Sequence, residues 1–586
     1  MAAEAGRGRL ARLAASPWFA YGSVFLIQSK VLWGIWNHRD LTSGDSSDYF
    51  TLATQWSASF HLDPVWSPLD SVAWGSLQWF VGDAFASEIT YRIIVAIAVS
   101  LLLLAVLRRL LSPGIAWALA VWWAILPVNF DETFEVHLFA LIPGLIAVVV
   151  ALSGSGLRMR AAVFGILLAD ALLVRNETAV AALAWLAVWL VYEWRRDAAD
   201  RLPTGTVVRA VAVPLAALAL IEGAVLLSFP ARGDLRHLSD AKHTNNVCQI
   251  YTYGYQQRHS DFAGSPWTEC DRLMERDFDR PRPTLTEAIT SNPGAMAEHF
   301  LWNVELTPAA LQLLLFDRTS YGDGHDPDYI PVETGSTLAL LGSVAVIAFC
   351  AGGLALLWRE RRQWWERWIA PRAWGWAALA AVALSDVAVM LVARPRPEFI
   401  FGVTFLLLVV IGMAAMAYVR RWPSLGRLGL LTPLLAMAVL IGVPSHYSSG
   451  YRTPLAFRDG QPLKQVVDRL EPYSAKLRGD QVGLLATYGQ DACRYVGRED
   501  PCRAVTWPSI WERSQATSAP EALAAQGVDF IYVDSEDMRN PAVREVVEGL
   551  EPAEWRPVGP PLAQGWTLLR RASSAAPTAQ SASSAT

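Results

Sequence analysis

Long runs of apolar residues, separated by short polar connections, make up most of the chain as far as residue 445. A helix needs about 20 apolar residues to cross the hydrocarbon core of a bilayer. Runs of roughly this length occur at residues 18–36, 91–111, 114–129, 138–153, 161–175, 178–193, 207–229, 335–358, 373–393, 399–419 and 428–445. The pattern predicts a mainly α, polytopic membrane helix bundle of about eleven spans.

Arginines are concentrated in alternate connections between these runs. They are Arg7, Arg9 and Arg12 before the first run, then Arg108, Arg109, Arg158, Arg160, Arg195, Arg196, Arg201, those of residues 359–372, Arg420, Arg421 and Arg427. Because basic residues mark cytoplasmic connections, we expect an inner (plasma) membrane protein whose residues 1–17 are cytoplasmic. No short apolar region ends in a small-residue cleavage site, so the first span is interpreted as an uncleaved signal anchor.

Composition agrees with a membrane protein and excludes other classes. Hydrophobic residues make up 53% of the chain and charged residues only 18%, which is too apolar for a soluble globule of this length. The formal net charge of −5 is small and argues against a nucleic-acid partner.

Three long segments fall on the predicted outer side. Residues 18–446 form the expected membrane module, with outer loops at 37–90 and 230–334. The first loop is rich in aromatic residues, which suits helices lying in the membrane interface: Trp56, Phe60, Trp66, Trp74, Trp79 and Phe80. In the second loop, His299 and Asn303 have the spacing of an amphipathic surface helix.

Residues 447–572 have the pattern of a small extracytoplasmic α/β domain. Short apolar runs at 482–486, 504–507, 528–533 and 566–569 predict strands, and residues 462–471, 519–526 and 541–550 predict helices. The segment is long enough to bury a core of its own. The Ala-, Ser- and Thr-rich tail, residues 573–586, is predicted to be disordered.

Four of the five cysteines form two close pairs in the predicted outer segments. Cys248 is near Cys270 and Cys493 is near Cys502, whereas Cys350 lies alone in an apolar run. Disulfides form outside the cytoplasm, so we predict these two pairs as disulfides; free thiols in a cytoplasmic domain are the alternative. The spacings do not match a zinc site.

Acidic residues in the first two outer connections are candidates for chemistry. Asp45 and Asp48 follow the first span, and the next outer connection carries Asp131, Glu132, Glu135 and His137. An ionised carboxylate at the membrane surface can act as a general base, although Asp45 could instead cap a helix beginning at Ser46. Hard oxygen ligands of the second group suit Mg²⁺ or Mn²⁺, but a solvated acidic loop explains the same residues without a metal.

Three arginines depart from the arginine pattern because they fall in short outer connections. Arg175 precedes Glu177, and Arg394 and Arg396 precede Glu398. A guanidinium stays charged and binds phosphate through two hydrogen bonds, so we predict that these arginines bind a phosphate group. Ion pairs of Arg175 with Glu177 and of Arg396 with Glu398, or anchoring to anionic lipid, are the alternatives.

The order of these motifs resembles the membrane glycosyltransferases of the GT-C superfamily, the mannosyltransferase-like and RgtA/B/C/D-like proteins. The resemblance covers about residues 18–445 and rests on the acidic motif Asp45–Tyr49, the second acidic group, the Arg175–Glu177 turn and the Arg-Pro segment before Glu398. It implies a polyprenyl-phosphate-linked sugar donor and a first-loop carboxylate as base, here Asp45. Many relatives have adjacent acidic residues where this chain has Asp45 followed by Ser46, so Asp48 could share the role.

The resemblance therefore implies an inverting glycosyltransferase with Asp45 and Asp48 as catalytic candidates. Its acceptor would be an extracytoplasmic glycan, lipid or protein. Two other classes stay open: a transporter or flippase of a lipid-linked saccharide, and a non-catalytic anchor for a binding domain. A transporter should need Asp170 or Asp386, which lie within apolar spans, and a binding module should need residues 447–572.

Overall fold

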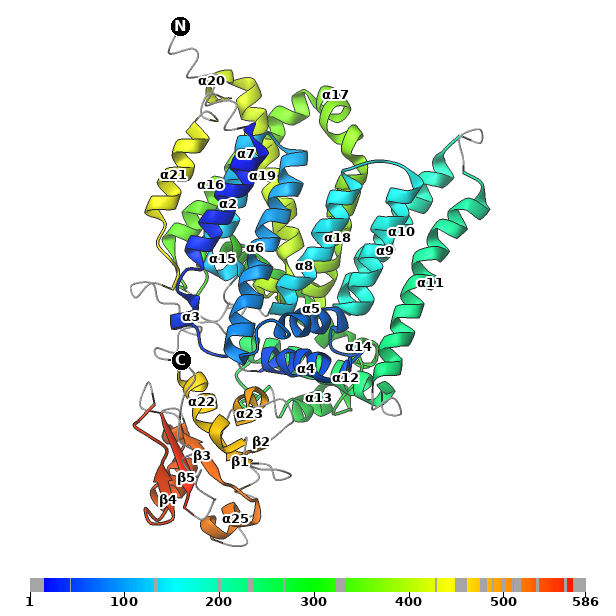
Figure 1. Ribbon diagram of the computed structural model, residues 1–586. Coiled ribbons are helices and arrows are strands. Elements are labelled where there is room, and N and C mark those ends of the chain that lie inside the picture. The colour runs from blue at the N-terminus through cyan, green and yellow to red at the C-terminus, as the bar shows by residue number, and fades with distance from the viewer. Residues whose placement is uncertain are drawn as a thin grey trace. The chain divides into compact units, whose positions relative to one another are not determined.

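The fold is described from a computed structural model of the chain (Figure 1). The structure describes residues 15–42, 44–130, 135–197, 202–229, 235–266, 269–322, 333–426, 429, 431–447, 461–474, 482–486, 489–496, 502–507, 510, 518–533, 537–562 and 566–572. The chain divides into two compact units. Unit 1 comprises Met1–Trp33, Asp63–Asp70 and Arg92–Thr453, and unit 2 comprises Gly34–Leu62, Ser71–Tyr91 and Pro454–Thr586.

A helix forms in each of the eleven predicted apolar runs. These helices are α2 (Pro17–Val31), α6 (Ala84–Leu110), α7 (Pro113–Ile125), α8 (Glu135–Ala151), α9 (Leu157–Leu173), α10 (Ala179–Arg195), α11 (Thr204–Ser228), α16 (Thr337–Arg359), α18 (Ala373–Val392), α19 (Phe401–Arg421) and α21 (Thr432–Gly442). Among the described residues, five helical segments are long and apolar enough to cross a membrane: Ala84–Leu110, Thr204–Ser228, Thr337–Arg359, Arg361–Val392 and Phe401–Arg421. The predicted polytopic helix bundle is confirmed.

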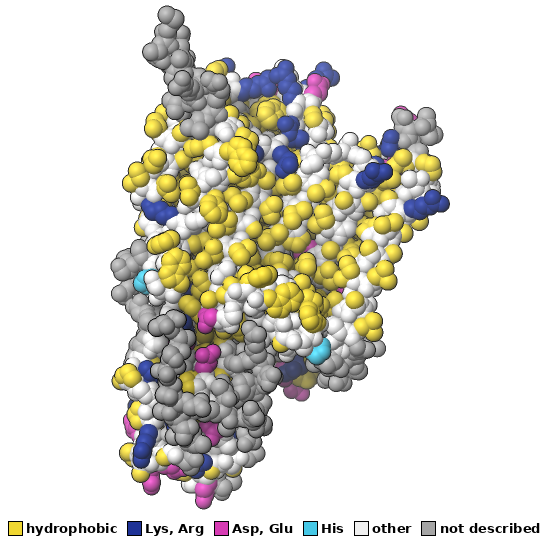
Figure 2. Space-filling model, in the orientation of Figure 1, with side chains coloured by type: hydrophobic (Ala, Val, Ile, Leu, Met, Phe, Trp, Pro, Cys, Tyr) yellow, Lys and Arg dark blue, Asp and Glu magenta, His cyan; other side chains and the backbone are white. Residues whose placement is uncertain are grey.

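Arginines of the predicted cytoplasmic connections lie at one end of the unit 1 bundle. The Nε of Arg372 donates to the carbonyl of Arg109 at 2.7 Å, and Arg420 forms an ion pair with Glu360 at 3.1 Å. Figure 2 shows Lys and Arg side chains gathered at this end, around α17 (Arg361–Trp364). Arg394 follows the other end of α18, whose 20 residues span about 30 Å. It therefore lies far from the basic end.

Four further helices follow α11 within unit 1: α12 (Leu235–Arg258), α13 (Cys270–Phe278), α14 (Leu285–Ser291) and α15 (Pro293–Phe316). They share a small core that includes Tyr251, Leu273 and Phe278. The prediction that His299 and Asn303 lie on a surface helix is wrong. Both side chains are buried, because α15 packs against α18.

Unit 2 combines parts of the first loop with a small α/β fold. Its helices include α4 (Asp45–Ser59), α22 (Pro462–Ser474), α23 (Gly489–Tyr495), α25 (Ala519–Ala525) and α26 (Pro541–Glu548), as well as most of α5 (Pro68–Gln78). Its strands are β1 (Val482–Leu485), β2 (Cys502–Val505), β3 (Phe530–Val533), β4 (Trp555–Pro557) and β5 (Thr567–Arg571).

The five strands form one mixed sheet in the order β2-β1-β3-β5-β4. Strands β2, β1 and β3 are parallel, β5 pairs antiparallel with β3, and β4 pairs antiparallel with β5. Four of these strands overlap the predicted apolar runs. Sequence analysis missed β4, which has only three residues and ends at Pro557, a residue suited to an edge strand.

Both predicted disulfides are present. Cys248 is bonded to Cys270, and Cys493 is bonded to Cys502. Cys350 is a buried free thiol in α16, as its isolated position predicted. The predicted disordered tail, residues 573–586, lies outside the described residues.

Candidate active site

A pocket in unit 1 lies among α8, α9, α10 and α18, which pack against one another (Figure 1). Its polar lining comes from the start of α8, the last turn of α9, the connection between α9 and α10, the last turns of α18 and the segment before α19. The lining includes His137, Asp170, Arg175, Glu177, Thr178, Ser385, Asp386 and Glu398. Residues far apart in the sequence thus meet in one polar site.

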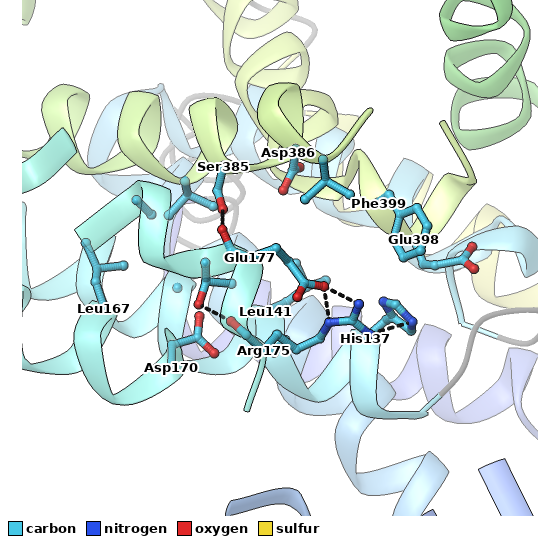
Figure 3. Close-up of a pocket in the computed structure, with 16 residues that line it drawn as sticks. His137, Leu141, Leu167, Asp170, Arg175, Glu177, Ser385, Asp386, Glu398 and Phe399 are labelled. Carbon is cyan, nitrogen blue, oxygen red and sulfur yellow. Dashed lines mark hydrogen bonds and ion pairs between the residues drawn. The ribbon is translucent and has the colours of Figure 1, made fainter. Parts of the chain in front are cut away.

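Arg175 lies between two of the predicted site residues (Figure 3). Its Nη1 donates to Nε2 of His137 at 2.7 Å, and its Nε and Nη2 contact the Oε1 of Glu177. The chain is held in this turn because Thr178 Oγ1 donates to the carbonyl of Arg175 at 2.8 Å, and Ser385 Oγ donates to the carbonyl of Glu177 at 2.7 Å. The ion-pair alternative offered for Arg175 is therefore present.

Arg396, another of the predicted phosphate-binding arginines, lies near the same aromatic ring as Arg175, that of Phe399. The guanidinium of Arg175 lies 5.8 Å from the Phe399 ring centroid, and that of Arg396 lies 5.9 Å from it. The His137 ring lies 5.1 Å from the same centroid. Arg396 is also 3.6 Å from Glu398. Two guanidinium groups and an imidazole therefore lie around one aromatic ring, and each guanidinium is paired with a carboxylate.

Arg394 takes a different position within unit 1. Its guanidinium lies 3.8 Å from the ring centroid of Tyr253 on α12. The preceding end of α18 is fixed by α15, since His299 Nε2 donates to the carbonyl of Val392 at 2.8 Å and Asn303 donates to that of Leu391 at 3.0 Å. These bonds satisfy carbonyls that a helix end leaves without partners. Burial lowers the pKa of His299 to about 4.

Glu135 is held in a buried ion pair that sequence analysis did not predict. Its Oε1 contacts Nη2 of Arg92, whose Nη1 donates to the carbonyl of Phe130 at 3.1 Å. Both side chains are almost completely buried, so Glu135 does not belong to a solvated acidic loop. Asp131 and Glu132, which complete the predicted acidic group, lie outside the described residues.

The two buried aspartates within the spans differ in their surroundings. Asp386 Oδ2 accepts from the backbone N–H groups of Gly402 at 2.5 Å and Val403 at 3.1 Å, so it caps the first turn of α19. Asp170 is buried at the end of α9, and its Oδ1 has no hydrogen-bond partner among the described residues. Asp386 therefore has a structural function that accounts for its burial.

Asp45 and Asp48 belong to unit 2, in the first turn of α4. The alternative that Asp45 caps a helix beginning at Ser46 is not observed: the helix begins one residue earlier, and Gly44 takes the N-cap position. Asp45 is exposed and makes no hydrogen bond or ion pair with the residues that the structure describes. Asp48 instead forms an ion pair with Arg494 of α23.

The predicted metal ligands do not form a cluster within the described part of the chain. The single group there with metal-site spacing is Cys248, Cys270 and Asp271, and its two sulfurs are joined in a disulfide. Glu135 is engaged by Arg92 and Asp48 by Arg494. Binding of Mg²⁺ or Mn²⁺ stays a prediction, and no chemical step is derived from it.

Several functional neighbours were missed by sequence analysis. Arg92 had a signal, since it stands at the predicted outer end of a span, where the arginine pattern disfavours it. Phe399 and Tyr253 had none, because aromatic residues near a membrane are common. Asp491 and Arg494 of α23, described below, also had none, since charged residues are ordinary in a soluble domain.

No family model matches the chain, and no curated protein matches its sequence. Among solved structures, the apo oligosaccharyltransferase of Archaeoglobus fulgidus shares 11% identity over 89% of this chain and 70% of that chain, with a TM-score of 0.48. A complex of that protein with Zn and sulfate has a TM-score of 0.46 at 12% identity, over 91% of this chain and 70% of that one. ArnT from Cupriavidus metallidurans bound to undecaprenyl phosphate shares 12% identity over 95% and 98% of the two chains, with a TM-score of 0.40.

Proposed function

We propose that the chain is an integral-membrane glycosyltransferase that moves a sugar from a polyprenyl-phosphate-linked donor to an extracytoplasmic acceptor. The observation that carries the proposal is the meeting of Arg175, Arg396 and His137 around Phe399. This group lies beyond the end of α9 and of α18, opposite the basic end of the bundle. A lipid phosphate at the outer membrane surface would meet such a group of donors.

Arg175 and Arg396 bind the donor phosphate in this proposal. Each is paired with a carboxylate, Arg175 with Glu177 and Arg396 with Glu398, which balances the charge of the donor-free site. The Glu177 and Arg175 side chains are 31% and 19% exposed, so their ion pair is weak and a phosphate can compete for the guanidinium. The resulting phosphate–guanidinium bonds would be charge-assisted.

The exposed carboxylate of Asp45 is the proposed general base. It accepts the proton of the acceptor hydroxyl while the hydroxyl oxygen attacks the anomeric carbon. The new glycosidic bond forms as the bond between the anomeric carbon and the phosphate oxygen breaks, and attack opposite the leaving group inverts the anomeric centre. The phosphate leaves with the bonding electron pair, and the arginines stabilise its negative charge.

We place the transfer site on the outer side of an inner (plasma) membrane, with a cytoplasmic N-terminus. The two disulfides support this sidedness, since both lie in segments that would be extracytoplasmic. The segregation of Arg109, Arg372 and Arg420 to the opposite end of unit 1 agrees with it. The acceptor would be a cell-envelope glycan, a lipid or a protein.

The transporter alternative receives less support from the structure. Asp386, one of its two candidate residues, caps α19 through two backbone hydrogen bonds and so has a structural reason to be buried. The binding-module alternative expects the function to need residues 447–572. Residues of that segment and of the first loop belong to the same compact unit.

A strain without the gene provides the test. We expect its envelope glycans to lack one sugar and the corresponding lipid-linked sugar to accumulate. Expression of the wild-type chain or of the control variant Asp468→Asn, which changes an exposed carboxylate on α22, should restore the parent pattern. Asp45→Asn should not restore it. Identical glycans and lipid-linked sugars in the deletion strain and its parent would overturn the proposed function.

A further inference from the structure

The first turn of α4, which carries Asp45, is held by a side chain from the C-terminal part of unit 2. The backbone N–H of Gly44 donates to Oδ1 of Asp491 at 3.1 Å, and Ser47 Oγ donates to the same oxygen at 2.7 Å. Helix N-termini are usually capped by a residue at the N-cap itself. Here Gly44 has no side chain for this purpose, and Asp491 replaces it from a position 447 residues away.

Arg494 joins this contact one helical turn after Asp491. Its Nη2 forms an ion pair with Asp48, and its Nη1 donates to Ser47 Oγ at 2.6 Å. The same Nη1 lies 3.2 Å from Oδ1 of Asp491. Asp491 is 1% exposed, so its charge is balanced by Arg494 and by hydrogen bonds within this contact.

The helix that carries these residues is itself fixed within unit 2. The hydroxyl of Tyr495 donates to Oε2 of Glu88 at 2.9 Å, and its ring centroid lies 4.6 Å from that of Phe50 on α4. The disulfide between Cys493 and Cys502 ties α23 to β2. The first turn of α4 is thus connected, through α23, to the central sheet.

We propose that Asp491 and Arg494 are positioning residues for glycosyl transfer, which hold the first turn of α4 so that the Asp45 carboxylate stays oriented toward the acceptor. This inference rests on the proposed function. Arg494 forms an ion pair with Asp48, whereas Asp45, three residues earlier, has no hydrogen-bond or ion-pair partner among the described residues. The C-terminal domain therefore acts as part of the transferase, and the two first-turn aspartates have different functions.

A displaced base slows the chemical step more than it weakens substrate binding, because a misplacement of about 1 Å can cost roughly a hundredfold in rate. We expect Arg494→Gln to lower kcat about tenfold to a hundredfold, with KM for the lipid-linked donor within about twofold of the wild-type value. Arg494→Lys keeps the charge and should recover most of this loss.

The pH profile provides a readout that loss of folding alone would not produce. Among the residues of unit 2 that the structure describes, the charged groups around the first turn of α4 are Asp48, Asp491, Arg494 and, through Tyr495, Glu88. Removing the Arg494 charge should move the acidic limb of the kcat/KM profile to higher pH, because a neighbouring positive charge favours the ionised form of a carboxylate. Asp491→Asn removes a negative charge and should move the limb in the opposite direction.

The experiment compares purified full-length wild type, Arg494→Gln, Arg494→Lys, Asp491→Asn and Asp45→Asn in a transfer assay with a polyprenyl phosphate sugar. Arg556→Gln, at an exposed arginine of β4, is the matched control and should have wild-type kinetics. Thermal unfolding in detergent verifies folding. If Arg494→Gln does not fold, the opposite pH shift of Asp491→Asn and the recovery in Arg494→Lys decide the question.

An inactive Asp45→Asn together with a wild-type kcat and pH profile in both Arg494→Gln and Asp491→Asn would overturn this inference alone. An equal loss in Arg494→Lys and Arg494→Gln, without opposite pH shifts, would also overturn it, because this is the result of a purely structural contact. Full transfer by Asp45→Asn would instead contradict the proposed function.

Discussion

Replacement of Arg175 by lysine tests the phosphate site most sharply. Lysine keeps the positive charge but lacks the planar guanidinium, with which Arg175 contacts His137 through Nη1 and Glu177 through Nε. If Arg175 binds the donor phosphate, Arg175→Lys should weaken that binding. If the residue serves only as the ion-pair partner of Glu177, donor binding should not change.

The size of the effect follows from the contacts of Arg175. A lost charge-assisted hydrogen bond costs about 1.5 to 3 kcal/mol, which corresponds to a roughly ten- to hundredfold higher Kd. The ion pair with Glu177 is partly exposed, so its loss should lower stability by less than about 1 kcal/mol. The change in donor affinity should therefore exceed the change in folding stability.

Titration of a polyprenyl phosphate sugar into detergent-solubilised protein measures this Kd. The matched control is Arg420→Lys, since Arg420 also pairs with a glutamate but lies at the opposite end of the bundle. Glu177→Gln tests the direction of the change in donor affinity. It removes the carboxylate that competes with the donor phosphate for Arg175, so donor binding should not become weaker. An unchanged Kd in Arg175→Lys, or weaker donor binding in Glu177→Gln than in the wild type, would refute the assignment.

Three further predictions concern stability. Arg92→Met should destabilise the protein by about 3 to 5 kcal/mol because it leaves Glu135 buried without its counter-ion, and Arg92→Met with Glu135→Leu should recover part of this loss in thermal unfolding. Replacing Cys493 and Cys502 by serine should cost about 3 kcal/mol, as expected for closing a short loop; an unchanged melting temperature would contradict it. The pKa of His299 falls from 6.5 to about 4 on folding, so the unfolded state is protonated at higher pH than the folded state. The contribution of His299 to the free energy of unfolding is therefore full above pH 6.5 and declines as the pH falls toward 4. His299→Gln should remove this decline.

The membrane helices could be predicted from sequence because the bilayer fixes their length and composition. The apolar run at 373–393 and helix α18, Ala373–Val392, agree to within one residue. The cysteine pairs could be predicted equally well, since both members of each pair lie in one outer segment and each cysteine has a single nearby partner there. Local constraints of this kind do not depend on how distant segments pack.

The contacts of the candidate site depended on such packing and could not be predicted. Arg92 and Glu135 are 43 residues apart, and neither has a spacing that identifies its partner. The cap of α4 is the clearest example. A shift of one residue in the helix start removed Asp45 from the N-cap position, and its replacement, Asp491, comes from the other end of the chain.

The measurement that tests the account most directly is sugar transfer by the purified full-length protein from a polyprenyl phosphate donor to an envelope acceptor, with wild type, Asp45→Asn and Asp48→Asn compared. We predict transfer by the wild type with inversion at the anomeric carbon. Asp45→Asn should be inactive yet bind the donor with wild-type affinity, and Asp48→Asn should retain part of the activity. Full activity in Asp45→Asn, or activity lost in Asp48→Asn but kept in Asp45→Asn, would contradict the account.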